Sequence, residues 1–290
     1  MSANESTVLQ ALATVVDPNT GRDFVSGKQV RQLRVEGGDV SFDVELGYPA
    51  RSQHAALRAA LVAAARTVPG VGNVSVSITT KITAHAVQRG VQLLPGVKNI
   101  IAVASGKGGV GKSTTTANLA LALAAEGASV GILDADIYGP SQPMMMGISG
   151  QPDFVKIDVE GHGVQVMSIG FMVGPDQAMI WRGPMATQAL DQLLRQTNWR
   201  DLDYLLVDMP PGTGDIALTL SQRVPLTGAI IVTTPQDIAL IDAKKGLTMF
   251  EKVGVPILGI VENMAVHVCT NCGHVEHIFG AEGGRKMAAE

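Results

Sequence analysis

The first ninety residues alternate between helix-like and strand-like patterns of apolar positions. In the opening segment, apolar side chains recur at helical spacing as far as Asp17-Pro18, which predicts a short first helix. These side chains are Val8, Leu9, Leu12, Val15 and Val16. A second helix is predicted over residues 52–68, where alanine and leucine dominate before the break at Pro69-Gly70.

Three segments of the same region alternate with the period of a half-buried strand. Residues 39–46 do so strictly, residues 28–35 look like their hairpin partner across a Gly-Gly turn, and residues 71–82 alternate again. The inward-facing set of the clearest strand is Val40, Phe42, Val44 and Leu46. The order helix, strand, strand, helix, strand predicts a small α+β domain over residues 1–90, in which no catalytic cluster is visible.

From residue 99 onward, continuous apolar runs alternate with helical patterns. The runs NIIAVAS, ASVGILD, DYLLVD, GAIIVTT and VPILGIVE lack period-2 alternation, which is typical of strands buried on both faces. Such strands separated by helices predict an α/β domain over residues 99–290, with a mostly parallel sheet flanked by helices. Residues 91–98, with few periodic signals, are the predicted linker.

Composition excludes several classes of protein. Of 290 residues, 46% are hydrophobic and 17% are charged, a balance typical of globular chains. The formal net charge is -4 and no long basic run occurs, so we expect no binding to nucleic acid or to a membrane. No apolar stretch approaches the roughly 18 residues of a membrane span, and the start lacks a signal-peptide pattern, so we predict a cytoplasmic protein.

The most specific local motif is GKGGVGKST, which follows an apolar run and precedes a helical pattern. It fits G-x-x-x-x-G-K-[ST]: glycines let backbone N–H groups surround phosphates, Lys112 reaches the outer phosphates, and Ser113 ligates Mg²⁺. We therefore predict a P-loop NTPase that binds ATP and Mg²⁺, with the strand-end Asp208 as a second magnesium ligand. The predicted nucleotide-binding residues of the loop are Gly106, Lys107, Gly108, Gly109, Val110, Gly111, Lys112, Ser113 and Thr114.

The same glycines also satisfy G-x-G-x-x-G, the fingerprint of a dinucleotide-binding turn. Asp134, at the end of the next predicted strand, lies about where a ribose-binding acid would sit. A dinucleotide-binding turn does not require the Lys112-Ser113 pair, however, and Asp208 is placed as a magnesium ligand. Both observations favour the NTPase interpretation.

Cys269 and Cys272, in HVCTNCGHVEH, are the only cysteines in the chain. Three interpretations compete. A redox pair usually begins a helix after a strand, and no helix cap is evident here. A zinc site recruiting His274 and His277 would crowd four ligands into nine residues. A two-fold dimer would instead bring together four thiolates, the set that iron-sulfur clusters prefer.

The motifs together resemble a known family. GKGGVGKST, with its extra Lys107, resembles the deviant phosphate loop of the MinD/ParA-like ATPases. LDADIYGPSQP, WRGPM, DMPPGTGD and ENMAVHVCTNCGH are similar to motifs of the Mrp/ApbC-type iron-sulfur cluster carrier ATPases, and the first ninety residues resemble the MIP18-type (DUF59) domain. The resemblance covers nearly the whole chain.

This resemblance implies roles for individual residues. Lys107 would reach across a dimer interface to the nucleotide of the second subunit, and with Lys112 and Asp136 it forms the expected catalytic set. Asp136, in a first switch, would orient water or magnesium, and residues 208–215 would form a second switch. Asn263 would contact the adenine ring. Cys269 and Cys272 of two subunits would bridge a 4Fe-4S cluster.

The resemblance also exposes two departures. The chain ends soon after the cysteine pair, where the family continues, so we expect the C-terminal part of the ATPase domain to be missing. The front domain has LGYPARSQ without a cysteine, so thiol chemistry is not expected there.

The resulting prediction is a cytoplasmic, homodimeric ATPase that carries a 4Fe-4S cluster from iron-sulfur assembly proteins to apo iron-sulfur proteins. Two alternatives stay open. One is a MinD/ParA-like positioning ATPase, which would need a basic surface or a membrane-targeting helix. The other is a zinc-stabilised nucleotide-binding interaction protein.

Overall fold

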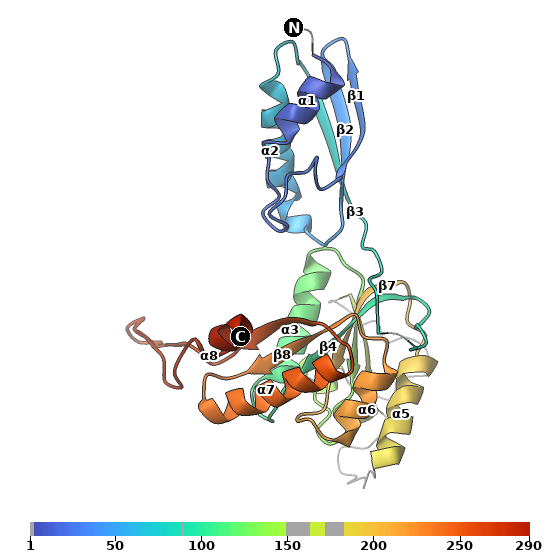
Figure 1. Ribbon diagram of the computed structural model, residues 1–290, viewed down its shortest axis with the longest axis vertical. Helices are drawn as coiled ribbons and strands as arrows, with labels where there is room; N and C mark the ends of the chain where they lie inside the picture. The colour runs from blue at the N-terminus through green and yellow to red at the C-terminus, as the bar shows by residue number, and fades with distance from the viewer. Residues whose placement is uncertain (1–2, 89, 149–162, 172–182) are drawn as a thin grey trace. The chain divides into compact units, whose positions relative to one another are not determined.

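The computed structural model describes residues 3–88, 90–148, 163–171 and 183–290 of the chain (Figure 1). Trp181 and Arg182 of the WRGPM motif lie outside these residues. The chain forms two compact units: Met1–Thr83 with Ala125–Gly127, and Ala84–Ala124 with Ala128–Glu290. The domain boundaries drawn from the sequence stay a prediction; the first strand of the second unit begins at Val97, inside the segment predicted as a linker.

The first unit has the predicted order of helices and strands. Strand β2 lies in the middle of a three-stranded sheet, antiparallel to β1 and parallel to β3, and α2 packs against β3. The alternating side chains of β2 are buried as predicted. The elements are α1 (Glu5–Leu12), β1 (Val30–Glu36), β2 (Asp39–Leu46), the 3₁₀-helix η1 (Arg51–Gln53), α2 (His54–Arg66) and β3 (Val74–Thr80).

The predicted first helix is too long. Helix α1 ends at Leu12, and the side chain of Val16 is 57% exposed and outside the helix. The chain leaves the helix because Asp17 is buried and its carboxylate accepts a hydrogen bond of 2.6 Å from the Tyr48 hydroxyl. A buried carboxylate needs such donors, and a continued helix would carry Asp17 away from its partner on a distant segment.

The second unit is built on a parallel sheet. In the described part of the chain it has six strands in the order β6-β5-β7-β4-β8-β9, and every adjacent pair is parallel. The strands are β4 (Val97–Ala104), β5 (Val130–Asp134), β6 (Val164–Ser168), β7 (Leu202–Asp208), β8 (Gly228–Thr233) and β9 (Ile257–Glu262). Five of them coincide with the predicted apolar runs; the edge strand β6 was not predicted.

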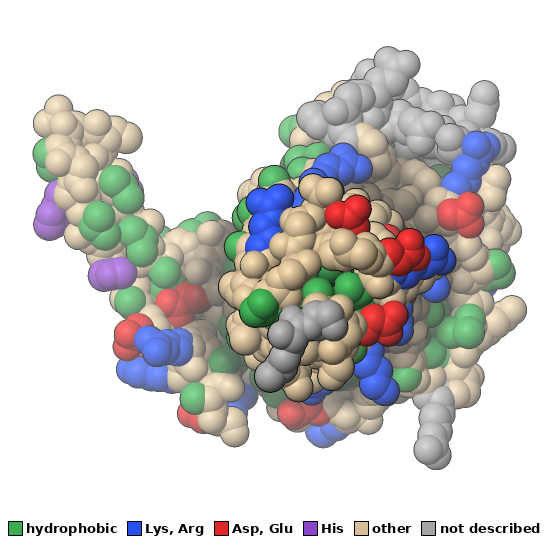
Figure 2. All heavy atoms as spheres, turned by 90° about the horizontal axis from the view of Figure 1, so that it is seen from above, with side chains coloured by type: hydrophobic (Ala, Val, Ile, Leu, Met, Phe, Trp, Pro, Cys, Tyr) green, Lys and Arg blue, Asp and Glu red, His purple; other side chains and the backbone are tan. Residues whose placement is uncertain are grey.

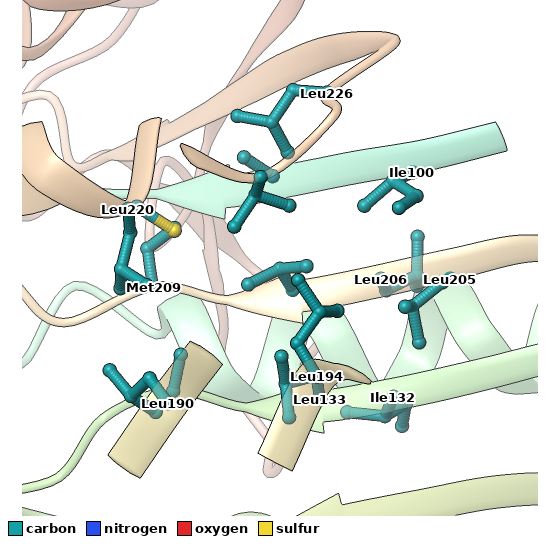
Figure 3. Close-up of a cluster of buried hydrophobic side chains, with 14 of the residues drawn as sticks. Ile100, Ile132, Leu133, Leu190, Leu194, Leu205, Leu206, Met209, Leu220 and Leu226 are labelled. Atoms are coloured by element: carbon teal, nitrogen blue, oxygen red, sulfur yellow. The ribbon is translucent and has the colours of Figure 1, made fainter. Parts of the chain in front are cut away.

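Helices cover the sheet and close its core. Leu205 and Leu206 of β7 are fully buried, and the cluster in Figure 3 continues through Ile132 of β5 and Leu190 of α5. Burial of whole strands is the reason that their sequences lack alternation. The helices of this unit are α3 (Lys112–Ala125), α4 (Gln142–Met145), the 3₁₀-helix η2 (Ile169–Phe171), α5 (Gly183–Gln196), α6 (Asp215–Arg223), α7 (Asp237–Lys252) and α8 (Gly283–Ala289). Among the described residues, no helix combines the length and apolarity that a membrane crossing requires.

The sheet brings polar residues together at its carboxyl edge. Strand β4 leads into the glycine-rich loop, and the neighbouring strands β5 and β7 end at Asp134 and Asp208, which are partners in the strand register. Open parallel sheets bind ligands at this edge. The fold class predicted from the sequence is confirmed: a mostly parallel sheet flanked by helices, preceded in the sequence by a small α+β domain.

Candidate functional site

The glycine-rich loop lies between the end of β4 and the start of α3, as predicted. It borders a cavity of about 360 Å³ whose lining includes Lys112, Ser113, Thr114 and Asp136. Gly109 and Gly111 have φ angles of 80° and 89°, which L-residues with a side chain rarely adopt. The loop therefore turns its backbone toward the cavity in a way that requires glycine at these positions.

Gly106 is needed for a different reason. A Cβ atom at this position would overlap the backbone of Asp242 and Ala243 in α7, whereas a Cβ atom at Gly108 would meet no atom within 4 Å. The phosphate loop thus packs against α7 through Gly106. Backbone atoms cannot move aside as a flexible side chain can, so this contact leaves no room for a methyl group.

We expect Gly106→Ala to destabilise the second unit by about 1–3 kcal/mol or more, because overpacking forces the loop and α7 apart. Gly108→Ala is the matched control and should remain close to the wild type in stability. Urea unfolding followed by tryptophan fluorescence measures both variants. Equal stability of the two would contradict the close approach of the loop to α7.

Lys112, which lines the cavity, is paired with two carboxylates. Its Nζ lies 2.5 Å from Oδ1 of Asp208 and 3.7 Å from Oδ2 of Asp136, and its side chain is only 6% exposed. A buried ammonium group requires such partners, since desolvation of an unpaired charge is costly. The carboxylates thus hold Lys112 beside the cavity into which the loop turns.

Both carboxylate oxygens of Asp208 accept hydrogen bonds. Oδ1 accepts hydrogen bonds from Lys112 and from the Thr116 hydroxyl at 3.3 Å, and Oδ2 accepts one of 2.8 Å from the Gln142 side chain. The side chain of Asp208 is fully buried. Thr116 and Gln142 were not predicted; Thr116 lies one helical turn after Lys112, a spacing that places both on one side of α3.

Asp134 fixes the position of the segment that contains Asp136 by accepting hydrogen bonds from it. Its Oδ2 accepts hydrogen bonds of 3.0 Å from the backbone N–H groups of Ser141 and Gln142 and from the Ser168 hydroxyl. Burial, and then the negative charge of Asp208, raise the pKa of Asp134 to about 6. Burial also raises the pKa of Asp136, although the Lys112 ammonium group lowers it. We call residues 135–142, where the resemblance predicts a first switch, the first switch segment.

These residues fit a nucleotide with magnesium. Ser113, Asp136 and Asp208 offer oxygen ligands, which Mg²⁺ prefers. Two buried polar atoms of the first switch segment, Oγ of Ser141 and Oε1 of Gln142, have no hydrogen-bond partner in the described chain. Buried polar atoms are normally paired, so such orphans are expected where a ligand completes the site.

The remaining predicted residues surround the loop. Lys107 is exposed, at the tip of the loop. Asn263, which follows β9, donates a hydrogen bond of 2.9 Å from its side chain to the carbonyl oxygen of Val110. Met264, the next residue, lines the cavity. The structure thus places Asn263 against the phosphate loop itself.

The cysteines lie on a hairpin beyond β9, formed by β10 (His267–Val268) and β11 (Val275–Glu276). The hairpin projects from the second unit as the red segment of Figure 1. A tight turn closes it: the Cys269 N–H donates to the carbonyl oxygen of His274, and the Gly273 N–H donates to that of Cys269, both at 2.9 Å. Cys272 is exposed and Cys269 partly so.

The turn favours the thiolate form of Cys269. Hydrogen bonds from the backbone N–H groups of Cys272 and Asn271, and then from the Cys272 thiol, lower the pKa of the Cys269 thiol. The thiolate is the form of cysteine that ligates metals. The cysteine turn therefore presents two sulfur ligands on an accessible surface.

The histidines of the hairpin have other contacts. His277 Nδ1 hydrogen-bonds to the carbonyl oxygen of Ala265, and His267 Nε2 lies 3.9 Å from a carboxylate oxygen of Glu276. Within the residues that the structure describes, no group of three or more histidine, cysteine or acidic side chains is arranged to hold a metal ion. The Cys₂His₂ arrangement considered from the sequence is therefore not assembled in the described chain.

The hairpin also exposes an apolar surface. Its residues are between 43% and 61% exposed, and Figure 2 shows hydrophobic and histidine side chains on the projecting arm. This hairpin surface consists of Val266, Val268, Val275, Ile278 and Phe279. Contiguous exposed apolar side chains are typical of protein–protein contact sites.

Models of two protein families match the two parts of the chain. A family model described as NUBPL iron-transfer P-loop NTPase matches residues 96–290, and one described as iron-sulfur cluster assembly protein matches residues 5–77. The chain is similar to a Pseudomonas fragi protein named iron-sulfur cluster carrier protein, with 60% identity over 227 residues, which cover 76% of this chain and 79% of the relative.

Two further matches define the extent of the similarity. A protein of the same name from Escherichia coli K12 is 67% identical over 198 residues, which cover 67% of this chain and 54% of the relative, so the matched region spans about half of that protein. A solved structure of a nucleotide-binding protein from Archaeoglobus fulgidus in complex with ADP matches with a TM-score of 0.59 and 40% identity, covering 67% of this chain and 78% of that one.

Proposed function

This chain belongs to the NUBPL iron-transfer P-loop NTPase family, and on that premise we propose that it is an ATP-hydrolysing carrier of 4Fe-4S clusters. In this proposal two copies of the chain hold one cluster, receive it from iron-sulfur assembly proteins and pass it to apo iron-sulfur proteins. The observation that carries the proposal is the presence, in one unit, of a phosphate loop and an accessible two-cysteine turn.

The residues around the cavity support nucleotide hydrolysis. Lys112 would exchange its carboxylate partners for the outer phosphates of ATP, while the loop N–H groups bind the inner ones. Ser113 and Asp208 would hold Mg²⁺, which neutralises charge on the phosphates when bound. Asp136, at the cavity wall, would orient the attacking water, and Lys107, exposed at the loop tip, would reach the nucleotide of the second copy.

The number of thiols that one chain offers supports cluster binding at a two-fold axis. The turn offers two thiols, Cys269 and Cys272, and no third metal-binding side chain joins them in the described residues. A second copy related by a two-fold axis would complete four thiolates. The exposed hairpin surface would be covered by the second copy, and a cluster held between chains would be open to loading and release.

Asn263 supports coupling between the two sites. Its side chain is bonded to the phosphate loop at Val110, and its backbone N–H donates to the carbonyl oxygen of Thr233 at 2.8 Å. Only five residues separate Asn263 from Cys269. A change in the loop on nucleotide binding would therefore act at the base of the cysteine hairpin, as a two-state dimer requires.

The reducing cytoplasm, which keeps such thiols free, is the location we propose.

Anaerobic reconstitution with iron and sulfide tests this function. Iron, sulfide and zinc are determined chemically, and sedimentation gives the mass. The proposal requires about four irons and four sulfides per two chains, as a thiolate-bound 4Fe-4S cluster demands. One firmly held zinc per monomer, with no cluster and no magnesium-dependent ATP hydrolysis, would contradict it and favour the zinc-stabilised alternative.

A further inference from the structure

Gln142 joins three parts of the nucleotide site. It is the first residue of α4 and is fully buried. Its side-chain Nε2 donates to Oδ2 of Asp208 at 2.8 Å and to the carbonyl oxygen of Ser113 at 3.0 Å, while its backbone N–H donates to Asp134. One residue thus connects the first switch segment to the end of β7 and to the start of α3.

The bond from Gln142 becomes critical when Lys112 leaves Asp208. Lys112 and Thr116 both bind Oδ1 of that carboxylate, and Gln142 alone among the hydrogen bonds of the described residues binds Oδ2. When Lys112 turns to phosphate, the Thr116 bond of 3.3 Å is long and weak. The amide of Gln142 then fixes the rotation of the carboxylate, and hence the direction in which Oδ1 points.

The orientation of the amide is itself determined. Both N–H groups of Nε2 have acceptors, and a flip would turn Oε1 toward a carboxylate and a carbonyl oxygen, which would repel it. Oε1 is therefore held away from these two acceptors, in a buried position where it has no hydrogen-bond partner among the described residues. An unpaired buried acceptor is destabilising, and a donor such as magnesium-bound water would remove that cost.

We propose that Gln142 is a positioning residue for magnesium: it orients Asp208 and ties the first switch segment to the metal. This inference rests on the proposed function of the cavity as a nucleotide site. Partners behind metal ligands are often as important as the ligands, because they fix ligand orientation. Gln142 is the last residue of the first switch segment, so it would also transmit the presence of the metal to that segment and, through its backbone N–H, to Asp134.

Gln142→Met tests the proposal, because methionine keeps the length of the side chain without its polar atoms. The measurement is the affinity for a fluorescent N-methylanthraniloyl-ADP, by titration with excess Mg²⁺ and with EDTA. In the wild type, Mg²⁺ should tighten binding. In the variant the tightening should fall by about 10-fold to 100-fold, as for other partners of metal ligands, with the affinity in EDTA unchanged.

Gln165→Met is the matched control. Gln165, on β6, also makes two hydrogen bonds through its amide, both to the backbone of Arg200, and neither residue lines the cavity. It should leave the effect of Mg²⁺ unchanged. Gln142→Asn, one methylene too short to reach Asp208, is interpreted in the same way as Gln142→Met and replaces it if the methionine variant does not fold.

Two results would overturn the inference. One is full tightening by Mg²⁺ in the Gln142 variants; the other is an equal loss of affinity with Mg²⁺ and with EDTA, which indicates a purely structural role. Failure of the wild type to bind nucleotide at all would instead refute the proposed function, so the two failures are distinguishable.

Discussion

Replacing Cys269 by alanine abolishes iron-sulfur cluster assembly on this chain and leaves nucleotide binding intact: this is the largest effect that we expect. Each chain offers two thiols, so a dimer of the variant keeps two of the four thiolates that a 4Fe-4S cluster needs. The hairpin lies outside the phosphate loop, and alanine preserves its backbone bonds. Anaerobic reconstitution, with iron counted per chain and the visible absorption recorded, measures the loss.

His274→Ala is the control within the same turn. The contribution of His274 to the turn is its carbonyl oxygen, which accepts from Cys269 and survives the substitution. The variant should therefore assemble a full cluster, and fluorescent nucleotide should bind to it as to Cys269→Ala. A full cluster on Cys269→Ala would refute the assignment of the ligand, whereas loss of metal from His274→Ala would favour the zinc site considered from the sequence.

The parts of the molecule that the sequence predicts are those that local physics determines. The phosphate loop needs glycine at positive φ, as at Gly109 and Gly111, and the strands of a doubly covered sheet need unbroken apolar runs. Parallel strands place their carboxyl ends on one edge, so Asp134 and Asp208 had to lie near the loop. These relations require only the order of the elements.

What the sequence does not reveal depends on partners that lie far along the chain. Gln142 follows a turn-like Gly-Pro and looks like an ordinary loop residue. It is buried, however, because its side chain donates a hydrogen bond to Asp208, which lies 66 residues further along the chain. Ser168 belongs to a short edge strand whose pattern is too brief to recognise. The first helix ends early for the same reason, since the partners of Asp17 include Tyr48. Long-range hydrogen bonds override local propensity here.

Lys112→Met should have two separable consequences. The first is a loss of stability of about 3–5 kcal/mol in the nucleotide-free chain, because removing one member of a buried ion pair leaves the other charge uncompensated. Asp208 is fully buried and would lose its partner at 2.5 Å. The second is a large loss of nucleotide affinity, because the phosphates lose a cation. Urea unfolding followed by tryptophan fluorescence reports on the second unit, to which Trp199 belongs.

The double variant Lys112→Met with Asp208→Asn separates these consequences. Asparagine carries no charge, and its oxygen still accepts from Gln142, so most of the stability should return. Nucleotide affinity should not return, because neither substitution supplies a cation for phosphate. A single variant as stable as the wild type would contradict the buried pair, and nucleotide binding by the double variant would contradict the role of Lys112. The same lysine that would bind ATP thus also stabilises the nucleotide-free fold, because its charge is paired with two carboxylates beside the cavity.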